Sequence, residues 1–253
     1  MGILNVTPDS FSDGGRYDDV GRAVERALRL IEEGADIIDV GGESTRPGAA
    51  PVEEDIERAR VLPVISALRA RTDLPISIDT MKPAIARDAV AAGARMWNDV
   101  SALGFAADSL ATAACLACPV ILMHRQPSDG ETGVIEAVSD FLAARAAAAI
   151  AAGVAREAIW LDPGIGFRKT PAQSLAILRD LDRIVERGFP VLLGASRKRF
   201  IAAVDASAAE PADRLAGSIA VGLAGARAGV AALRVHDVRE TRQALLVDAA
   251  IHG

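Results

Sequence analysis

The sequence predicts an α/β fold and, within that class, a single (β/α)8 barrel of the TIM type over residues 1–253. Short, nearly continuous apolar segments alternate with helical segments eight times along the 253 residues. This alternation is typical of a parallel sheet covered on both faces, and eight units in about 250 residues fit a barrel better than an open doubly wound sheet. An open Rossmann-type sheet would need a G-x-G-x-x-G motif after an early strand, and the sequence has none.

The first half of the chain carries four strand–helix units. The apolar run 2–4 indicates a buried strand that ends at Asn5, and apolar residues at helical spacing predict a helix over 20–33, closed by Gly34. Lys82 and Pro83 begin the third helix. The other strands of this half are expected at 35–40, 76–79 and 95–99, and its other helices at 53–71, 82–93 and 105–115.

The second half repeats the pattern. Its first helical segment is rich in alanine, and this low complexity reflects the use of strong helix formers. No segment rich in proline, glycine and serine separates the units, so one domain is expected. The strands are expected at 119–124, 158–161, 190–193 and 231–235, and the helices at 137–152, 172–187, 211–227 and 238–251.

Composition and charge exclude several classes of protein. Hydrophobic residues make up 51% of the chain, enough for a large core, and the net charge of −6 favours neither nucleic acid nor an anionic membrane surface as a partner. No apolar run could span a bilayer and no secretion signal is visible, so we expect a soluble cytoplasmic protein. Cys115 and Cys118 have C-x-x-C spacing without a second ligand pair, and we interpret them as buried structural thiols.

Polar residues stand at the carboxyl end of every expected strand. In a barrel these ends lie on one face, where such enzymes bind their substrates. The loop after the first strand is also long and rich in serine, aspartate and glycine, which suits an anion with its metal ion. In strand order the polar ends are Asn5, 43–46, Asp79, Asn98 with Asp99, Met123 with His124, Asp162, 196–199, and Arg234 with His236.

The residue types at these ends indicate two subsites. The first combines carboxylate, amide and ammonium groups, as a flat guanidine-like heterocycle such as a pterin requires; it consists of Asp79, Asn98, Asp162 and Lys198. A buried ion pair, for example between Asp162 and Lys198, is the alternative interpretation. The second subsite pairs Arg234 with His236, which point the same way toward an anion beside Asn5 on the neighbouring first strand. A core histidine remains the alternative for His236.

Several other chemistries find no support in the sequence. The segment 164–170 lacks the glycine before lysine that a P-loop needs. Three histidines with scattered acids form no zinc pattern, and there is no G-x-S-x-G motif for a serine hydrolase. A Schiff base at Lys198 stays open, although its arginine neighbours favour a charged hydrogen-bonding role.

The sequence resembles the dihydropteroate synthase family almost from end to end. Six blocks carry the resemblance in the family's usual order, namely 2–15, 41–48, 76–83, 162–170, 194–201 and 234–241. The resemblance implies condensation of 6-hydroxymethyl-7,8-dihydropterin diphosphate with 4-aminobenzoate, which gives 7,8-dihydropteroate and diphosphate. It also implies a Mg²⁺ ion, a role in folate synthesis, inhibition by sulfonamides and a homodimer. Small residues along 217–232 would allow the close helix packing of a homodimer.

The resemblance also assigns a role to each candidate residue. Asn5 would help to hold Mg²⁺, while Asp79, Asp162, Lys198 and Arg46 would be the catalytic residues. The pterin would be held by Asp79, Asn98, Asp162 and Lys198, with Met123 and Phe167 packing nearby. Diphosphate would be bound by Arg234, His236, Thr45 and Arg46, and the aminobenzoate pocket would be framed by Phe11, Pro47, Lys198 and Arg199. Charge neutralisation of the diphosphate and a pterin ring able to stabilise cationic character lead us to expect a dissociative, SN1-like displacement.

The chain departs from the family pattern at a few positions. Arg199 stands where serine is common beside the aminobenzoate carboxylate, which leaves sulfonamide sensitivity open. Arg125 and Arg168 also replace residues common in the family, and we expect both at the barrel mouth. The family usually has a short segment before the first strand, so we expect either a trimmed chain or a lineage without that segment.

Two other functions would use part of the same residue pattern. A pterin-dependent methyltransferase would share the pterin pocket but would need neither the 44–46 loop nor the Arg-x-His anion site. A paralogue that only binds pterin would gain nothing from a site for a leaving group.

Overall fold

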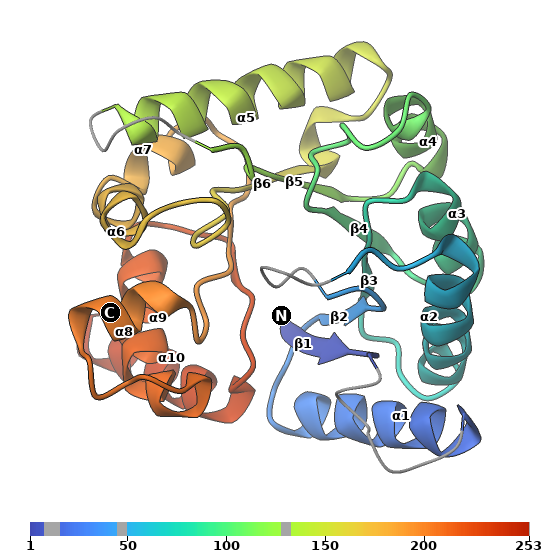
Figure 1. Cartoon of the computed structure of the whole chain (residues 1–253), viewed down its shortest axis with the longest axis horizontal. Coiled ribbons are helices and arrows are strands. Elements are labelled where there is room, and N and C mark those ends of the chain that lie inside the picture. Colours follow the sequence, from blue (N-terminus) through green and yellow to red (C-terminus); the bar gives the residue numbers. More distant parts are fainter. Residues whose placement is uncertain (8–15, 45–49, 128–132, 253) are drawn as a thin grey trace.

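A computed structural model describes residues 1–7, 16–44, 50–127 and 133–252 (Figure 1). Each expected strand is present in it, although every strand is short. The strands are β1 (Gly2–Asn5), β2 (Ile38–Gly41), β3 (Ile76–Asp79), β4 (Met96–Asp99), β5 (Val120–Met123), β6 (Ile159–Asp162), β7 (Leu192–Leu193) and β8 (Ala232–Leu233).

The strands are parallel and follow one another in chain order around a ring. β1 to β6 form one sheet, and β7 pairs with β8. Parallel bridges join Leu161 to Val191 and Gly2 to Val235, and the amide of Ile3 donates to the Val235 carbonyl at 3.0 Å. These contacts connect β6 to β7 and β8 to β1, so the predicted barrel is confirmed, with its helices outside the ring of strands (Figure 1).

The helices differ from the sequence prediction mainly at their first residues and at one break. The segment 172–187 is divided because Asp180 leaves helical dihedral angles, and the helix expected at 105–115 begins later because Asp99 and Ser109 accept hydrogen bonds from the backbone amides of Leu103 and Ala106. The observed helices are α1 (Arg16–Glu32), α2 (Glu54–Arg69), α3 (Pro83–Ala91), α4 (Ser109–Leu116), α5 (Val134–Ala151), α6 (Pro171–Arg179), α7 (Asp182–Val185), α8 (Arg199–Val204), α9 (Leu215–Arg227) and α10 (Val238–His252), with 3-10 turns η2 (Arg156–Ala158) and η3 (Pro211–Arg214). The expected helix 211–227 therefore begins as η3, and α8 was not predicted.

Strand residues divide into two layers because successive side chains point to opposite faces. Residues such as Ile78, Trp97 and Leu161 belong to the core between strands and helices. A smaller apolar cluster that includes Met96, Ile121 and Leu192 fills the inside of the ring. This packing leaves the inward positions at the carboxyl ends of the strands for polar residues, which is where the candidate site lies.

The cysteine prediction was wrong in one respect. Cys115 is exposed and Cys118 is half-buried, and both are free thiols. Cys115 lies in the last turn of α4, among residues that are not in the buried set of that short helix. Burial raises the pKa of the Cys118 thiol, so this cysteine is less reactive at neutral pH.

None of the described helices has the length and apolar character needed to cross a membrane.

Candidate active site at the carboxyl ends of the strands

Four predicted residues lie at the carboxyl ends of consecutive strands. Parallel pairing places Asp79 of β3 opposite Asn98 of β4, and Met123 of β5 opposite Asp162 of β6. All four side chains are buried, with exposed fractions of 8%, 3%, 2% and 4% respectively. The fold thus gathers the expected carboxylate and amide groups within one part of the barrel.

Arg234, which follows β8, connects these strands through its guanidinium group. Its Nη2 donates to Asp79 Oδ2 at 2.6 Å and its Nε donates to Asp39 Oδ2, also at 2.6 Å. The same Asp39 oxygen accepts a hydrogen bond from Asn98 Nδ2 at 3.2 Å. Charge-assisted bonds of this kind are among the stronger polar contacts in proteins. They fix the orientation of Arg234 and Asn98 inside the barrel.

Asp39 is a site residue that the sequence analysis missed. Its carboxylate is fully buried in the middle of β2, between Ile38 and Val40, whose side chains belong to the outer core. An ionised group within an apolar strand is costly unless it is paired. The isolated charge in the apolar run 37–40 was the available signal in the sequence, but it stands in the middle of a strand and not at its end.

The buried carboxylates have unusual acidity. Burial raises the pKa of Asp79, the Arg234 guanidinium opposes that shift, and the neighbouring Asp39 carboxylate adds to it. Burial also raises the pKa of Asp162, against the opposing hydrogen bond from the Gly164 amide and the charge of Lys198. Perturbed acids that face one another inside a barrel mark a candidate functional site.

Lys198 lies beside Asp162 but is not its ion-pair partner. The Lys198 ammonium is 3.9 Å from the centroid of the Phe167 ring, a cation–π contact. Within the described part of the chain Lys198 forms no ion pair, so the alternative of an Asp162–Lys198 pair is not what the structure has. Burial lowers the pKa of Lys198 to about 8, the charge of Arg234 adds to this, and Asp162 and Asp79 oppose it.

His236 and Asn5 lie at the carboxyl ends of two neighbouring strands, β8 and β1. The Nδ1 atom of His236 lies 3.0 Å from Ser196 Oγ, and Asn5 ends β1 with a half-buried side chain. Burial lowers the pKa of His236 to about 4, and the nearby Arg197 and Arg234 charges act in the same direction. The imidazole is therefore neutral near pH 7, and no nucleophile–base–acid triad is completed here, because Asp237 is bound by Arg197 instead.

A second buried ion cluster lies at the base of the loop after β2. The Lys82 ammonium contacts the carboxylates of both Glu43 and Glu57, and Glu57 is fully buried. Arg60 donates to the Gly42 carbonyl at 2.8 Å. The start of this loop is therefore anchored to α2 and to the residue that precedes α3.

Some candidate residues lie outside the described part of the chain or make no described contact. Arg199, at the start of α8, has an exposed side chain. Arg125 follows β5 and contacts the Met81 sulfur after β3, and Arg168 is exposed after β6, so both lie at the carboxyl side of the strands as expected. The expected ligands outside the described residues are Phe11, Thr45, Arg46 and Pro47.

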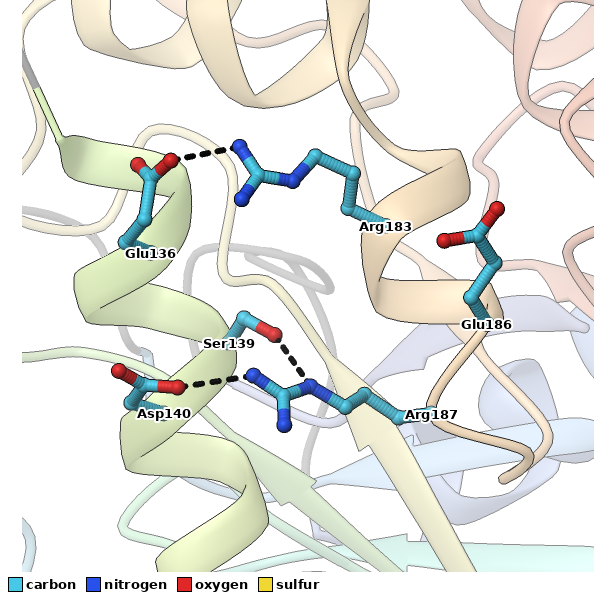
Figure 2. A pocket seen from close by; sticks show the side chains of 6 residues that line it. All are labelled: Glu136, Ser139, Asp140, Arg183, Glu186 and Arg187. Carbon is cyan, nitrogen blue, oxygen red and sulfur yellow. Dashed lines mark hydrogen bonds and ion pairs between the residues drawn. The ribbon is translucent and has the colours of Figure 1, made fainter.

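A polar groove between α5 and α7 is separate from these strand ends. Figure 2 shows its ion pairs, Arg183 with Glu136 at 2.6 Å and Arg187 with Asp140 at 2.8 Å. Its volume is about 360 Å³, and its lining comes only from the helical surface, namely Glu136, Ser139, Asp140, Arg183, Glu186 and Arg187. Because its charged groups are exposed and mostly paired, the groove is not the candidate site.

Comparison with known proteins agrees with this geometry. A family model described as pterin binding enzyme matches residues 1–236, which include every strand of the barrel. Dihydropteroate synthase from Streptococcus pyogenes is 45% identical over 247 residues, which are 98% of this chain and 93% of that protein. The chain belongs to the dihydropteroate synthase family of pterin-binding enzymes.

Solved structures of this family share the fold closely. Xanthomonas albilineans dihydropteroate synthase with 4-aminobenzoic acid is 49% identical, with a TM-score of 0.95 over 100% of this chain and 92% of that chain. The same protein in complex with 7,8-dihydropteroate gives a TM-score of 0.91 at 46% identity, over 100% and 93% of the two chains. The expected resemblance to dihydropteroate synthase is thus confirmed for the family and the fold.

The Asp39–Arg234 pair gives a prediction about stability. Asp39→Asn removes the charge of a fully buried carboxylate that pairs with Arg234, and we expect the free energy of unfolding to fall by about 3 kcal/mol. The loss stays at the lower end for a buried pair because Asp79 still pairs with Arg234. The measurement is urea unfolding, with the exposed Asp140 of the Arg187 pair as the control, where Asp140→Asn should cost less than about 1 kcal/mol. Equal costs for the two variants would contradict a stabilising role for Asp39.

Proposed function

We propose that the chain transfers the pterin-6-methyl group of 6-hydroxymethyl-7,8-dihydropterin diphosphate to 4-aminobenzoate, forming 7,8-dihydropteroate and diphosphate. Family membership supports this reaction. The observation that carries it in this chain is the buried layer of Asp79, Asn98 and Asp162 at the strand ends, beside the Lys198 ammonium. This proposal makes the chain a transferase of folate biosynthesis.

The buried layer suits a pterin because it offers both acceptors and donors. A pterin presents neighbouring N–H donors, which a carboxylate such as Asp162 accepts, and ring acceptors, which Asn98 and Lys198 can serve. Met123 and the Phe167 ring supply apolar surface for the flat heterocycle. Burial strengthens these hydrogen bonds because water does not compete for them.

Arg234 has a double role in this proposal. Its guanidinium is engaged by Asp39 and Asp79, so it holds Asp79 toward the pterin layer. The two carboxylates together carry more negative charge than the one guanidinium neutralises. The remaining negative potential favours positive charge on a pterin bound nearby. Arg234 and, from the loop after β2, Arg46 would contribute positive charge toward the diphosphate, while His236 and Thr45 would contribute hydrogen bonds.

The displacement follows from the positions of these charges. The bond from the exocyclic carbon to the diphosphate oxygen breaks, and its electron pair leaves with diphosphate. Asp79 and Asp162 stabilise the cationic character that develops on the pterin. The amine nitrogen of 4-aminobenzoate then forms a bond to the carbon and loses a proton to solvent, so positioning matters more than a strong base. Asp79, Asp162, Lys198 and Arg46 are the proposed catalytic residues.

The donor set at the anion subsite fits Mg²⁺. The Asn5 amide oxygen is a hard ligand at the end of β1, and the described residues contain no cluster of three or more acidic, histidine or cysteine ligands. Mg²⁺ is usually held by one or two protein oxygens together with water and substrate phosphates. Asn5 would hold the ion, which when bound would neutralise charge on the leaving diphosphate.

The aminobenzoate subsite is proposed at the mouth, beside Lys198. Phe11 and Pro47 would cover the ring of the amine substrate, and the Arg199 guanidinium would bind its carboxylate. Arginine can bind a carboxylate with two parallel hydrogen bonds, whereas a serine hydroxyl donates one.

A homodimer and a cytoplasmic location complete the proposal. Exposed apolar side chains gather on α10, at Leu246, Val247 and Ile251, with exposed fractions of 61%, 55% and 69%. Such residues are more common at contacts between copies of a chain than on a free surface. Free thiols at Cys115 and Cys118 suit a reducing compartment. Light scattering of the purified chain measures the oligomeric state directly.

The function is tested by following diphosphate release from the dihydropterin diphosphate, with and without Mg²⁺ and 4-aminobenzoate. Saturable release that needs both, with dihydropteroate formed in step, supports the synthase. Pterin binding without release would favour a binding paralogue. Methyl transfer from a methylated pterin would favour the methyltransferase, and absence of pterin binding would contradict the whole site.

Arg199 gives a prediction about substrate affinity. Arg199→Ser removes a cation from the proposed carboxylate site, and we expect the KM for 4-aminobenzoate to rise about fivefold, as the loss of an exposed ion pair worth about 1 kcal/mol would cause. The KM for the pterin substrate should not change. Steady-state kinetics with each substrate varied in turn measure both constants, and an unchanged KM for 4-aminobenzoate would remove Arg199 from that pocket.

His236 gives a prediction about proton uptake. Its pKa is lowered to about 4 in the free protein, so the imidazole is neutral at pH 6. A bound anion raises that pKa again, and diphosphate should therefore bind at pH 6 with uptake of a proton. Calorimetry in two buffers with different ionisation enthalpies measures this uptake. The His236→Gln variant is the control, and equal uptake in both proteins would show that His236 is not the group that titrates.

A further inference from the structure

The distribution of lysine in this chain is unusual. Only three of the 28 basic residues are lysine, namely Lys82, Lys169 and Lys198. All three follow carboxyl ends of strands, and none has an exposed side chain. Arginine serves at the other basic positions of the sequence. Lys82 pairs with two carboxylates and Lys198 faces Phe167, which leaves Lys169 without an assigned role.

Lys169 binds backbone carbonyl groups only. Its Nζ donates to the carbonyl oxygens of His124 at 3.0 Å, Gly164 at 3.0 Å and Phe167 at 3.3 Å. No ion pair of Lys169 occurs among the residues that the structure describes. A tetrahedral ammonium has three donors that can meet three converging oxygens, whereas the planar fork of a guanidinium cannot. Burial lowers the pKa of Lys169 to about 8, Asp162 opposes this and Lys198 adds to it.

The three carbonyl groups belong to two segments that pack unusually closely. His124 follows β5, and Gly164 follows β6. A Cβ atom on Gly164 would lie 1.9 Å from the His124 carbonyl oxygen, and the backbone of Gly164 has φ +66°. Three carbonyl oxygens that converge on one point repel one another unless a cation offsets their repulsion. The Lys169 ammonium supplies that cation at the place where the loop after β6 meets the end of β5.

The far end of the same loop sets the environment of Lys198. Phe167 accepts from Lys169 through its carbonyl, and its ring lies 3.9 Å from the Lys198 ammonium. Next to it, a Cβ atom on Gly166 would lie 3.3 Å from Lys198 Cδ, so loop and side chain are in close contact. A shift of this loop would therefore move the surface against which Lys198 is held.

We propose that Lys169 is a positioning residue that fixes the loop 164–168 on the end of β5 and so holds the Phe167 ring against the Lys198 ammonium. Lys169 does not touch the substrate in this proposal; it acts through Phe167 and Lys198. The inference rests on the proposed function only in treating Lys198 as a pterin ligand. The loop geometry is independent of that role.

The test uses Lys169→Met, which keeps an unbranched side chain that is one atom shorter and removes its donors. We expect the KM for dihydropterin diphosphate and the dissociation constant of a non-reactive pterin, measured by fluorescence, to rise about tenfold, as displacement of a binding group by a fraction of an ångström would cause. The KM for 4-aminobenzoate should change much less. Lys169→Arg should not rescue the loss, because the guanidinium cannot reach three oxygens at once. Arg179→Met, on the exposed face of α6, is the matched control and should leave both constants unchanged.

A double-mutant cycle with Phe167→Leu separates positioning from stability. If Lys169 acts through Phe167, then Lys169→Met should weaken pterin binding less than about twofold in the Phe167→Leu background, because coupled residues are not additive. An undiminished loss in that background, or a lower thermal midpoint with unchanged pterin affinity, would overturn the proposal. If Lys169→Met does not fold, the cycle is run with Lys169→Gln. Pterin binding is read without turnover, so failure of the synthase reaction and failure of this proposal remain distinguishable.

Discussion

The structure of this site depends on one buried cation held by two carboxylates. Arg234 bridges Asp39 and Asp79, and Asp39 also orients Asn98, so residues from three strands and from the end of β8 form one connected group. Each member would be costly to bury alone, and each is acceptable because the others are present. The floor of the barrel is apolar, and this group begins where the apolar cluster of Met96, Ile121 and Leu192 ends. The boundary between the two layers defines where a flat polar ligand can lie.

Strand ends and connecting segments contribute different parts of the proposed chemistry. The pterin groups lie on strand ends, where pairing fixes their mutual positions. The groups proposed for diphosphate and aminobenzoate stand mostly on connecting segments, such as the loop after β2, whose base is fixed by Lys82 through Glu43 and Glu57. Lys169 does the same for the loop after β6 with carbonyl groups as its partners. Each of these two lysines therefore fixes the position of a loop relative to the barrel strands.

The sequence predicted the barrel because its strands are apolar on both faces and alternate regularly with helices. It also predicted the site because the polar residues stand at the strand ends, which the barrel brings to one face. Asp39 was not predicted as a site residue because its partner, Arg234, is 195 residues away in the chain. No local sequence pattern shows that a charge within an apolar strand is paired. The break at Asp180 and the exposure of Cys115 were also missed, because helical periodicity alone shows neither where a helix is interrupted nor which of its residues stay exposed. The roles of Phe11, Thr45, Arg46 and Pro47 remain predictions, since these residues lie outside the described ranges.

The central claim is that the buried polar layer at the strand ends is the pterin site, and binding of a non-reactive pterin to Asp162→Asn tests it most directly. Asp162 is buried and accepts a hydrogen bond from the Gly164 amide at 2.7 Å, so asparagine keeps the shape and one acceptor but loses the charge. We expect pterin affinity to fall at least about tenfold, as the loss of a charge-assisted hydrogen bond worth 1.5–3 kcal/mol would cause, with a thermal midpoint close to that of the unaltered protein. Unchanged affinity in a folded variant would contradict the account and place the pterin elsewhere.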